Sequence, residues 1–148
     1  MRAIRRTNVK WPLLACVIVA ALGTQSSDAS RRDLLRTLHD ASRALQAGNA
    51  ALFLGCFDPS RFPGYARLQE DVVALTRQSD IASSIEVQTV EARDDNHAVT
   101  VDWLLQIRPA GGPGPAEQRR ETISLRIQME NGKPRIVGLT PADFFRPR

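Results

Sequence analysis

The hydrophobic pattern of the chain changes period once, near Ile81, and this change restricts the fold more than any other feature. Before Ile81, apolar residues recur at three- and four-residue steps, as they do on one face of a helix. After Ile81, apolar and polar residues alternate, as they do in strands with one buried face. Helices that precede the strands, rather than alternating with them, predict an α+β domain with its helices covering one face of an antiparallel sheet.

Three helices are expected before the sheet. The first should begin at Ser30, where Asp33 follows at the spacing of a capping box, and should end at Gly48. The second should run from Asn49 to Asp58, because the residue before a proline is pushed out of the helical conformation. The third is predicted from Tyr65 to about Ser79. The buried stripe of the first helix is predicted to be Leu34, Leu38, Ala41 and Leu45.

About four antiparallel strands are expected to follow as a meander. They are centred on residues 85–87, 99–107, 123–129 and 135–139. The sequences "RDDN" and "NGK" are typical of tight turns, and "PAGGPGPAEQ" is typical of a longer hairpin connection.

The N-terminal segment has the composition of a secretory signal peptide. Four basic residues precede an apolar run from Trp11 to Gly23, which is shorter than the ~20 residues that a membrane-spanning helix needs. Small residues at Ser27 and Ala29 then suit a cleavage point. We therefore expect a signal peptide over residues 1–29, cleavage near Ala29, and a single domain over residues 30–148 in the periplasm or outside the cell. Contact with a membrane would occur only through an uncleaved signal.

Two other export signals remain open alternatives. "LLAC" has the form of a lipoprotein box, but a box ending at Cys16 would divide the apolar run. "RRTNVK" has the paired arginines of a twin-arginine signal, but Asn8 stands where an apolar residue is preferred.

Removal of the signal changes the charge and the cysteine count. The chain has 20 basic and 16 acidic residues, and without residues 1–29 the numbers are 16 and 15. Such a balanced chain does not favour nucleic-acid binding, which needs clustered positive charge. Cys56 would be left without a disulfide partner, and two histidines without short spacings predict no metal site. No cofactor motif is present, because "GGPGP" lacks the Lys-Ser/Thr ending of a phosphate-binding loop.

Over residues 31–147 the chain resembles the nuclear transport factor 2-like superfamily. The similarity lies in a helix followed by "LQAGNAALFLGCFD", a third helix, and long strands ending in "GKPRIVGLTPADFFRP". This superfamily includes ketosteroid isomerases, scytalone dehydratases and polyketide cyclases of the SnoaL-like type. The resemblance implies a cystatin-like cone, in which three N-terminal helices pack on a curved antiparallel sheet of about four strands around a cavity.

The resemblance also identifies where catalytic groups would be expected. The helix-one tyrosine of the steroid isomerases is replaced by Ala41, so the family's catalytic set is incomplete. His39 is expected on the solvent side of its helix, and His97 in a hairpin turn or at the edge of a strand ladder. Three weak catalytic candidates remain, and each has an ordinary structural explanation. Asp58 would end the second helix, Tyr65 would pack in the core, and Asp102 would lie on the outer face of the sheet.

The C-terminal sequence "TPADFFRPR" places two phenylalanines side by side near the end of the chain. In an extended segment Phe144 and Phe145 would point to opposite sides, so that one would close the core and the other would meet a ligand or partner. We therefore expect residues 140–148 to be docked rather than loose.

These observations favour an exported domain that binds a small apolar ligand or a protein partner without catalysis. The expected contacts are made by Tyr65, Trp103, Phe144 and Phe145, and a homodimer through the open sheet face is expected. Two alternatives remain: a hydrolase or isomerase that places an acid and Tyr65 in the cone, and an accessory subunit of an envelope assembly.

Overall fold

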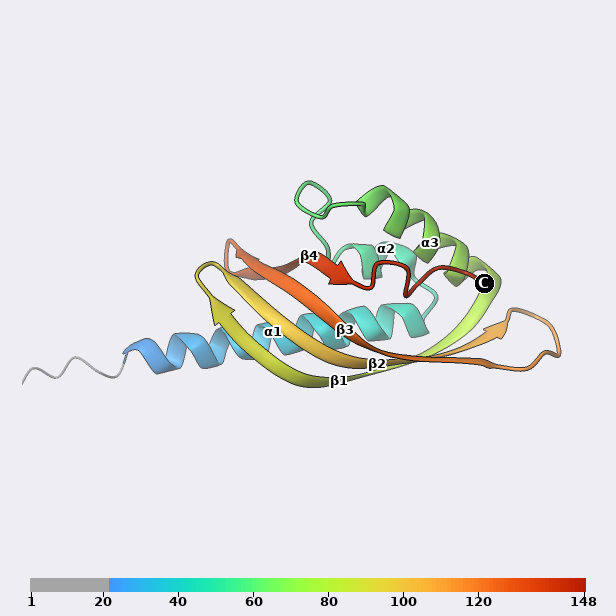
Figure 1. Cartoon of the computed structure of the whole chain (residues 1–148), viewed down its shortest axis with the longest axis horizontal. Helices are drawn as coiled ribbons and strands as arrows, with labels where there is room; N and C mark the ends of the chain where they lie inside the picture. Colours follow the sequence, from blue (N-terminus) through green and yellow to red (C-terminus); the bar gives the residue numbers. More distant parts are fainter. Residues whose placement is uncertain (1–21) are drawn as a thin grey trace, which may run out of the picture.

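The chain folds as helices followed by one curved sheet, which is the α+β layout that the change of period predicts and the cone that the family resemblance implies (Figure 1). The computed structural model describes residues 22–148. Its helices are α1 (Leu22–Gln46), α2 (Ala50–Leu54) and α3 (Tyr65–Gln78). Its strands are β1 (Ser79–Arg93), β2 (Asn96–Pro109), β3 (Glu117–Glu130) and β4 (Lys133–Thr140). No helix within this range combines the length and the apolar character needed to cross a membrane.

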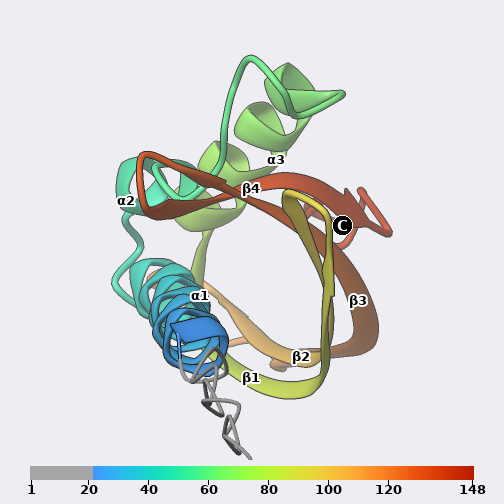
Figure 2. The same ribbon diagram turned by 90° about the vertical axis from the view of Figure 1, so that its left-hand side faces the viewer.

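The sheet is a meander in which all neighbouring strands are antiparallel, in the order β1-β2-β3-β4. Viewed from its end, it curves around the interior, with α1 beside β1 and with α2 and α3 on the side of the molecule where β4 lies (Figure 2). A bulge near Gln88 changes the phase of β1, so that Val87 and Val90 both lie on the inner face. Most polar residues of the strands face outward, whereas Ser83 of β1 and Arg119 of β3 face the interior.

Helix α1 begins before the predicted start at Ser30. The helix is continuous from Leu22, so Ser30 and Asp33 lie in its interior and form no capping box. Helix propagation needs only one further hydrogen bond per residue, and residues 22–29 contain no proline that would end the helix. The predicted buried stripe is confirmed, because all four of its residues are at most 1% exposed.

Helix α2 ends earlier than predicted, at Leu54 rather than Asp58. The chain leaves the helix after Gly55 and forms an isolated parallel bridge between Phe57 and Ile136 of β4. Two backbone hydrogen bonds make this bridge: Asp58 N–H donates to the carbonyl of Ile136, and Ile136 N–H donates to the carbonyl of Cys56. A long-range contact with the sheet therefore replaces the last turn of the predicted helix.

The core lies between the helices and the concave face of the sheet. The inward positions of β2 are Val99, Val101, Trp103, Leu105 and Ile107, all at most 6% exposed. They alternate with outward residues, as the predicted period requires.

Candidate functional site

The interior of the cone is packed with aromatic side chains. Phe53 packs against Phe57 and Phe145, with ring centroids 5.1 Å apart in both pairs. Trp103 packs edge-on against Phe145 at 5.1 Å, and Phe144 lies 5.0 Å from Phe145. All of these side chains are at most 1% exposed. Side chains of the protein itself thus fill the interior of the cone.

The polar edge of Trp103 is also satisfied within the protein. Its indole Nε1–H donates to Ser83 Oγ at 2.9 Å. Ser83 Oγ in turn lies 2.8 Å from Ser42 Oγ on α1. Buried tryptophans usually need such a partner, and here the partner ties the sheet to α1. No donor of Trp103 is left for a ligand.

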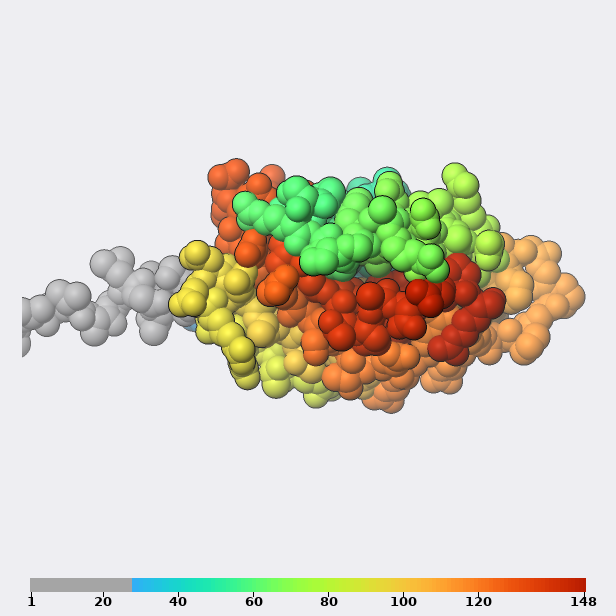
Figure 3. Space-filling model, turned by 45° about the horizontal axis from the view of Figure 1, so that its top comes forward, coloured from blue at the N-terminus to red at the C-terminus, as the bar shows by residue number. Residues whose placement is uncertain are grey.

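Two of the aromatic rings come from residues 140–148, which we call the tail. On the surface, the tail lies in a band between α3 and β3 (Figure 3). Its backbone forms turns, in which Phe144 N–H donates to the carbonyl of Pro141 and Arg146 N–H donates to the carbonyl of Asp143. Both phenylalanines therefore turn inward, instead of pointing to the opposite sides that an extended segment would give. The tail is docked, as we expected from its two phenylalanines.

Arg119 of β3 anchors the tail. Its side chain is 3% exposed, and its guanidinium donates to the backbone carbonyls of Phe144 and of Arg146, the latter at 3.0 Å. Glu117 accepts from the same guanidinium at 2.8 Å and at 3.0 Å. A charged group that is buried needs such partners. On the side of the tail towards α3, Nε of Arg146 lies 3.8 Å from Oδ2 of the buried Asp71.

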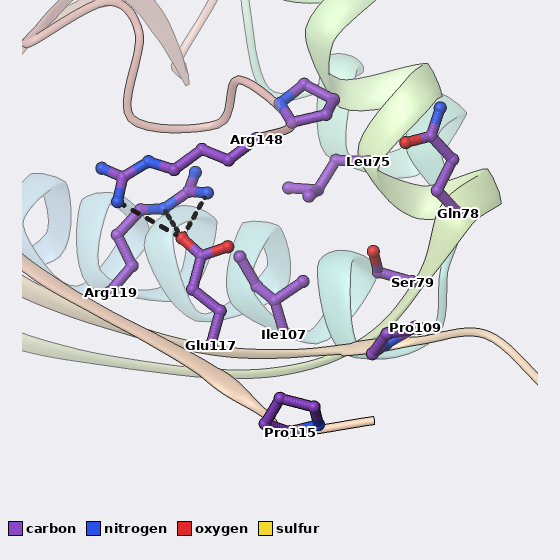
Figure 4. A pocket seen from close by; sticks show the side chains of 10 residues that line it. Leu75, Gln78, Ser79, Ile107, Pro109, Pro115, Glu117, Arg119 and Arg148 are labelled. Atoms are coloured by element: carbon purple, nitrogen blue, oxygen red, sulfur yellow. Dashed lines mark hydrogen bonds and ion pairs between the residues drawn. The ribbon is translucent and has the colours of Figure 1, made fainter. Parts of the chain in front are cut away.

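A small pocket lies where Arg119 and Glu117 meet the end of the chain (Figure 4). Its volume is about 180 Å³, and we call it the end pocket. A guanidinium nitrogen of Arg148 lies 3.6 Å from Oε1 of Glu117, and Arg148 covers one side of the pocket. Leu75, Ile107 and three prolines supply much of the remaining lining. The charged groups of this pocket already pair with one another, which leaves a mixed polar and apolar space of modest size.

A larger and more apolar depression lies outside the cone, between α1 and α2. Its volume is about 550 Å³. We call it the helix groove, and its lining residues are Asp40, Arg43, Ala44, Ala47, Ala51, Leu52, Gly55 and Cys56. Leu52 on its rim is 64% exposed, and it is the only large hydrophobic residue exposed in the described part of the chain. An exposed leucine beside a groove of small residues is an accessible apolar surface.

The similarity to known proteins is one of structure. No protein-family model and no curated protein matches the sequence. A protein of unknown function from Mycobacterium tuberculosis superimposes with a TM-score of 0.65 at 13% identity, over 79% of this chain and 73% of that chain. A proposed scytalone dehydratase from Novosphingobium aromaticivorans superimposes with a TM-score of 0.65 at 12% identity, over 78% of this chain and 85% of that chain. A nuclear transport factor 2-like superfamily protein from Salmonella enterica superimposes with a TM-score of 0.63 at 10% identity, over 77% of this chain and 89% of that chain.

The chain has the nuclear transport factor 2-like fold. Structures of this fold include a proposed dehydratase as well as proteins without an assigned activity. The fold alone therefore does not define a reaction, and function must be argued from the side chains of this chain. At the position where the sequence placed the tyrosine of the steroid isomerases, Ala41 is fully buried in the core.

The three catalytic candidates lie in separate parts of the fold. Asp58 is 6% exposed, and its Oδ1 accepts from the N–H and hydroxyl of Ser60, at 3.0 Å and 2.7 Å. These hydrogen bonds lower the pKa of Asp58, chiefly through the Ser60 hydroxyl. Asp102 is on the outer face of the sheet, where Arg120 donates to it at 2.9 Å and lowers its pKa. Tyr65 is half-buried at the start of α3.

The histidines and the cysteine have no catalytic partners in the described range. His39 is exposed on α1, as predicted. His97 is half-buried at the start of β2, and its Nδ1 has no hydrogen-bond partner. The Cys56 thiol donates weakly to the carbonyl of Leu52 at 3.7 Å. Burial and the nearby charge of Asp40 raise its pKa, which keeps it in the unreactive thiol form. Residues 22–148 contain no cluster suited to hold a metal ion.

Sequence reasoning missed Arg119 and the exposure of Leu52. Arg119 has the same parity as the inward residues Ile123 and Leu125, so the alternation of β3 contained a signal for its burial. Leu52 lies in the apolar run of the predicted second helix, and nothing in that run distinguishes it from the buried Phe53. A helix as short as α2 presents few positions to the core, and Phe53 and Leu54 occupy them.

Proposed function

We propose that this protein is an exported, non-catalytic binding domain whose binding surface lies outside the cone. On that surface it holds a small apolar ligand or an apolar segment of another protein chain. The observation that supports this most directly is the occupation of the cone interior by Phe144 and Phe145, which belong to the chain itself.

Binding inside the cone would require the tail to leave. Burial of one phenylalanine is worth about 1.5 to 3 kcal/mol, so exposing both would cost about 3 to 6 kcal/mol before any ligand contact forms. The hydrogen bonds from Arg119 to the tail would also be lost. This cost favours binding at a surface that is already open, and the helix groove with Leu52 on its rim is such a surface.

The arrangement of the titratable groups supports a non-catalytic role. Acid-base catalysis needs an acid and a base within hydrogen-bond reach of one substrate. Asp58 and Asp102 instead accept hydrogen bonds from Ser60 and Arg120, on different parts of the fold. These partners lower the pKa of both carboxyl groups, whereas a general base active near neutral pH needs a raised pKa.

Native mass spectrometry of the protein recovered from an exporting host tests the proposal. We expect a chain that begins near Ser30 and carries additional mass, either a small molecule or a second chain. Leu52→Asp should remove this mass, because it places a charge in the helix groove. Thr122→Arg on the outer face of the sheet is the matched control and should retain it.

Other outcomes would contradict particular parts of the proposal. A chain that begins at Met1 would exclude export by cleavage. Bound mass that survives Leu52→Asp but is lost when the tail is altered would place the binding site in the cone. A bare chain in both the natural protein and the variants would remove the support for a binding function.

A further inference from the structure

The rim of the helix groove carries two charges of opposite sign. Asp40 and Arg43 lie about one turn apart on α1, and both are exposed. Neither forms an ion pair with another residue in the described range, although Asp33 of the same helix pairs with Arg36. Residues at this spacing have their Cβ atoms about 5 to 6 Å apart. The rim therefore offers an unpaired anionic group and an unpaired cationic group within reach of one small molecule.

Charges of both signs also act on the interior of the groove. Cys56 lines the groove, and its pKa is raised first by burial and then by the negative charge of Asp40. The positive charge of Arg135 lowers the same pKa. The Arg135 guanidinium donates to the carbonyl of the lining residue Gly55 at 2.7 Å, so Arg135 adjoins the groove from β4. Neither a purely anionic nor a purely cationic ligand matches such a surface.

The lining of the groove is largely apolar and suits one small molecule. Its volume of about 550 Å³ falls within the range of about 300 to 1,000 Å³ that is usual for small-molecule sites. Ala44, Ala47 and Ala51 form walls of small side chains, which leave room for a ligand. Leu52 is exposed beside these walls. A hydrocarbon chain that covers Leu52 would remove this apolar side chain from water.

We propose that the helix groove binds a single-chain amphiphile with a zwitterionic head group, of the lysophospholipid class. Its hydrocarbon chain lies against Leu52 and the alanines, its phosphate pairs with Arg43, and its amine faces Asp40. Guanidinium groups bind phosphate oxygens through charge-assisted hydrogen bonds. An ethylene unit joins phosphate to amine in such head groups, so both charges can meet neighbouring side chains on one helix face. A fatty acid would also meet Arg43, but Asp40 would repel it. This inference rests on the proposed function, since it names the chemical class of the ligand at the same surface.

Binding of four probes that share a decyl chain tests the head group. The probes are decylphosphocholine, decyl sulfate, decyltrimethylammonium and decyl maltoside, which are zwitterionic, anionic, cationic and uncharged. Isothermal titration calorimetry of the exported protein, at probe concentrations below micelle formation, should show a single site. Decylphosphocholine should bind a few-fold more tightly than each of the other probes, because it alone gains both exposed ion pairs.

Neutralising one charge at a time should change the preferred head group. Asp40→Asn should shift the preference towards decyl sulfate, because the acid that repels an anion is removed. Arg43→Gln should shift it towards decyltrimethylammonium, because Asp40 then acts without the neighbouring cation. Leu52→Asp should weaken the binding of all four probes by at least about tenfold, as expected for a central apolar contact.

The control variant lies on another face of the molecule. Thr122→Arg should bind all four probes as the natural protein does, and every variant should keep the melting temperature within a few degrees, since these sites are exposed. Equal affinity for the four probes would overturn the inference. So would a preference that does not move in Asp40→Asn and Arg43→Gln, or binding that Leu52→Asp does not weaken.

The assignment of the head group and the proposed function can fail separately. If all four probes bind equally and Leu52→Asp abolishes their binding, the head group is refuted and a binding function at the groove is supported. The same holds if no probe binds but native mass spectrometry finds a second chain that Leu52→Asp removes, since the occupant is then a protein. If Leu52→Asp changes neither probe binding nor any bound mass, both proposals are wrong.

Discussion

The guanidinium of Arg119 on β3 donates a hydrogen bond to the backbone carbonyl oxygen of Phe144 in the tail. The same group also donates to the carbonyl of Arg146 and to the carboxylate of Glu117. One buried cation therefore fixes the path of the backbone on both sides of Phe145. This relationship explains how the eight residues after β4, which have no regular secondary structure, hold two aromatic rings in the core.

Replacement of Arg119 by methionine should loosen the tail. Methionine has a similar length but cannot donate, so two carbonyl oxygens would lose their partner, at about 1 to 3 kcal/mol for each buried group left unsatisfied. Urea unfolding should show this loss, and hydrogen exchange should increase in residues 140–148. The stability of Arg119→Lys should lie between those of the natural protein and Arg119→Met, because one ammonium group cannot reproduce the planar set of donors of a guanidinium. An unchanged exchange rate in the tail of Arg119→Met would show that Arg119 does not hold it.

Phe145→Ala should be among the most destabilising single substitutions in the chain. The ring is fully buried and contacts Phe53, Trp103 and Phe144. Removal of such a side chain typically costs about 3 to 5 kcal/mol. Thermal unfolding followed by near-ultraviolet circular dichroism of Trp103 would measure the effect. The exposed neighbour Ala142 supplies a control, since Ala142→Ser should leave the melting curve unchanged. An unchanged melting curve for Phe145→Ala would mean that the tail is not docked in solution.

The pair formed by Asp102 and Arg120 should make stability depend on acid pH. The hydrogen bond from Arg120, and then its charge, lower the pKa of Asp102 below its ordinary value. A carboxyl group whose pKa is lower in the folded state stabilises the protein above its unfolded-state pKa. It loses this contribution as the pH falls through the folded-state pKa.

Arg120→Gln tests this pair. The pKa of Asp102, followed by NMR of its side-chain carboxyl carbon, should rise towards the ordinary value. The stability difference between the natural protein and the variant should be present at neutral pH and should vanish in acid. Asp58 is an internal control, because Ser60 lowers its pKa and should do so equally in both proteins. A pKa of Asp102 that does not move would contradict the assigned cause.

The Cys56 thiol should react slowly with alkylating reagents in the dilute, folded protein. Burial raises its pKa first, and the negative charge of Asp40 raises it further. Because the thiolate is the reactive form, Asp40→Asn should increase the rate of iodoacetamide modification by a few-fold near pH 8. Mass spectrometry would follow the reaction. Asp33→Asn, one further carboxylate along α1, should have no effect, and an equal increase in both variants would refute the influence of Asp40.

The sequence by itself determined the class of the fold and much of its core. The helical spacing of Leu34, Leu38 and Leu45 and the alternation of Val101, Trp103 and Leu105 assign each residue a face, because helix and strand periods follow from local backbone geometry. All six residues are buried as predicted. The outward position of Asp102 follows from the same alternation and was predicted correctly.

Tertiary structure decided what local patterns do not contain. The end of α2 depends on the bridge between Phe57 and Ile136, which are distant in sequence. The inward turn of both tail phenylalanines depends on backbone turns and on Arg119, which comes from another strand. The helix groove exists only because α1 and α2 pack side by side, which leaves Leu52 outside the core. Periodicity describes one element at a time, whereas the filled cone and the exposed groove arise from contacts between elements.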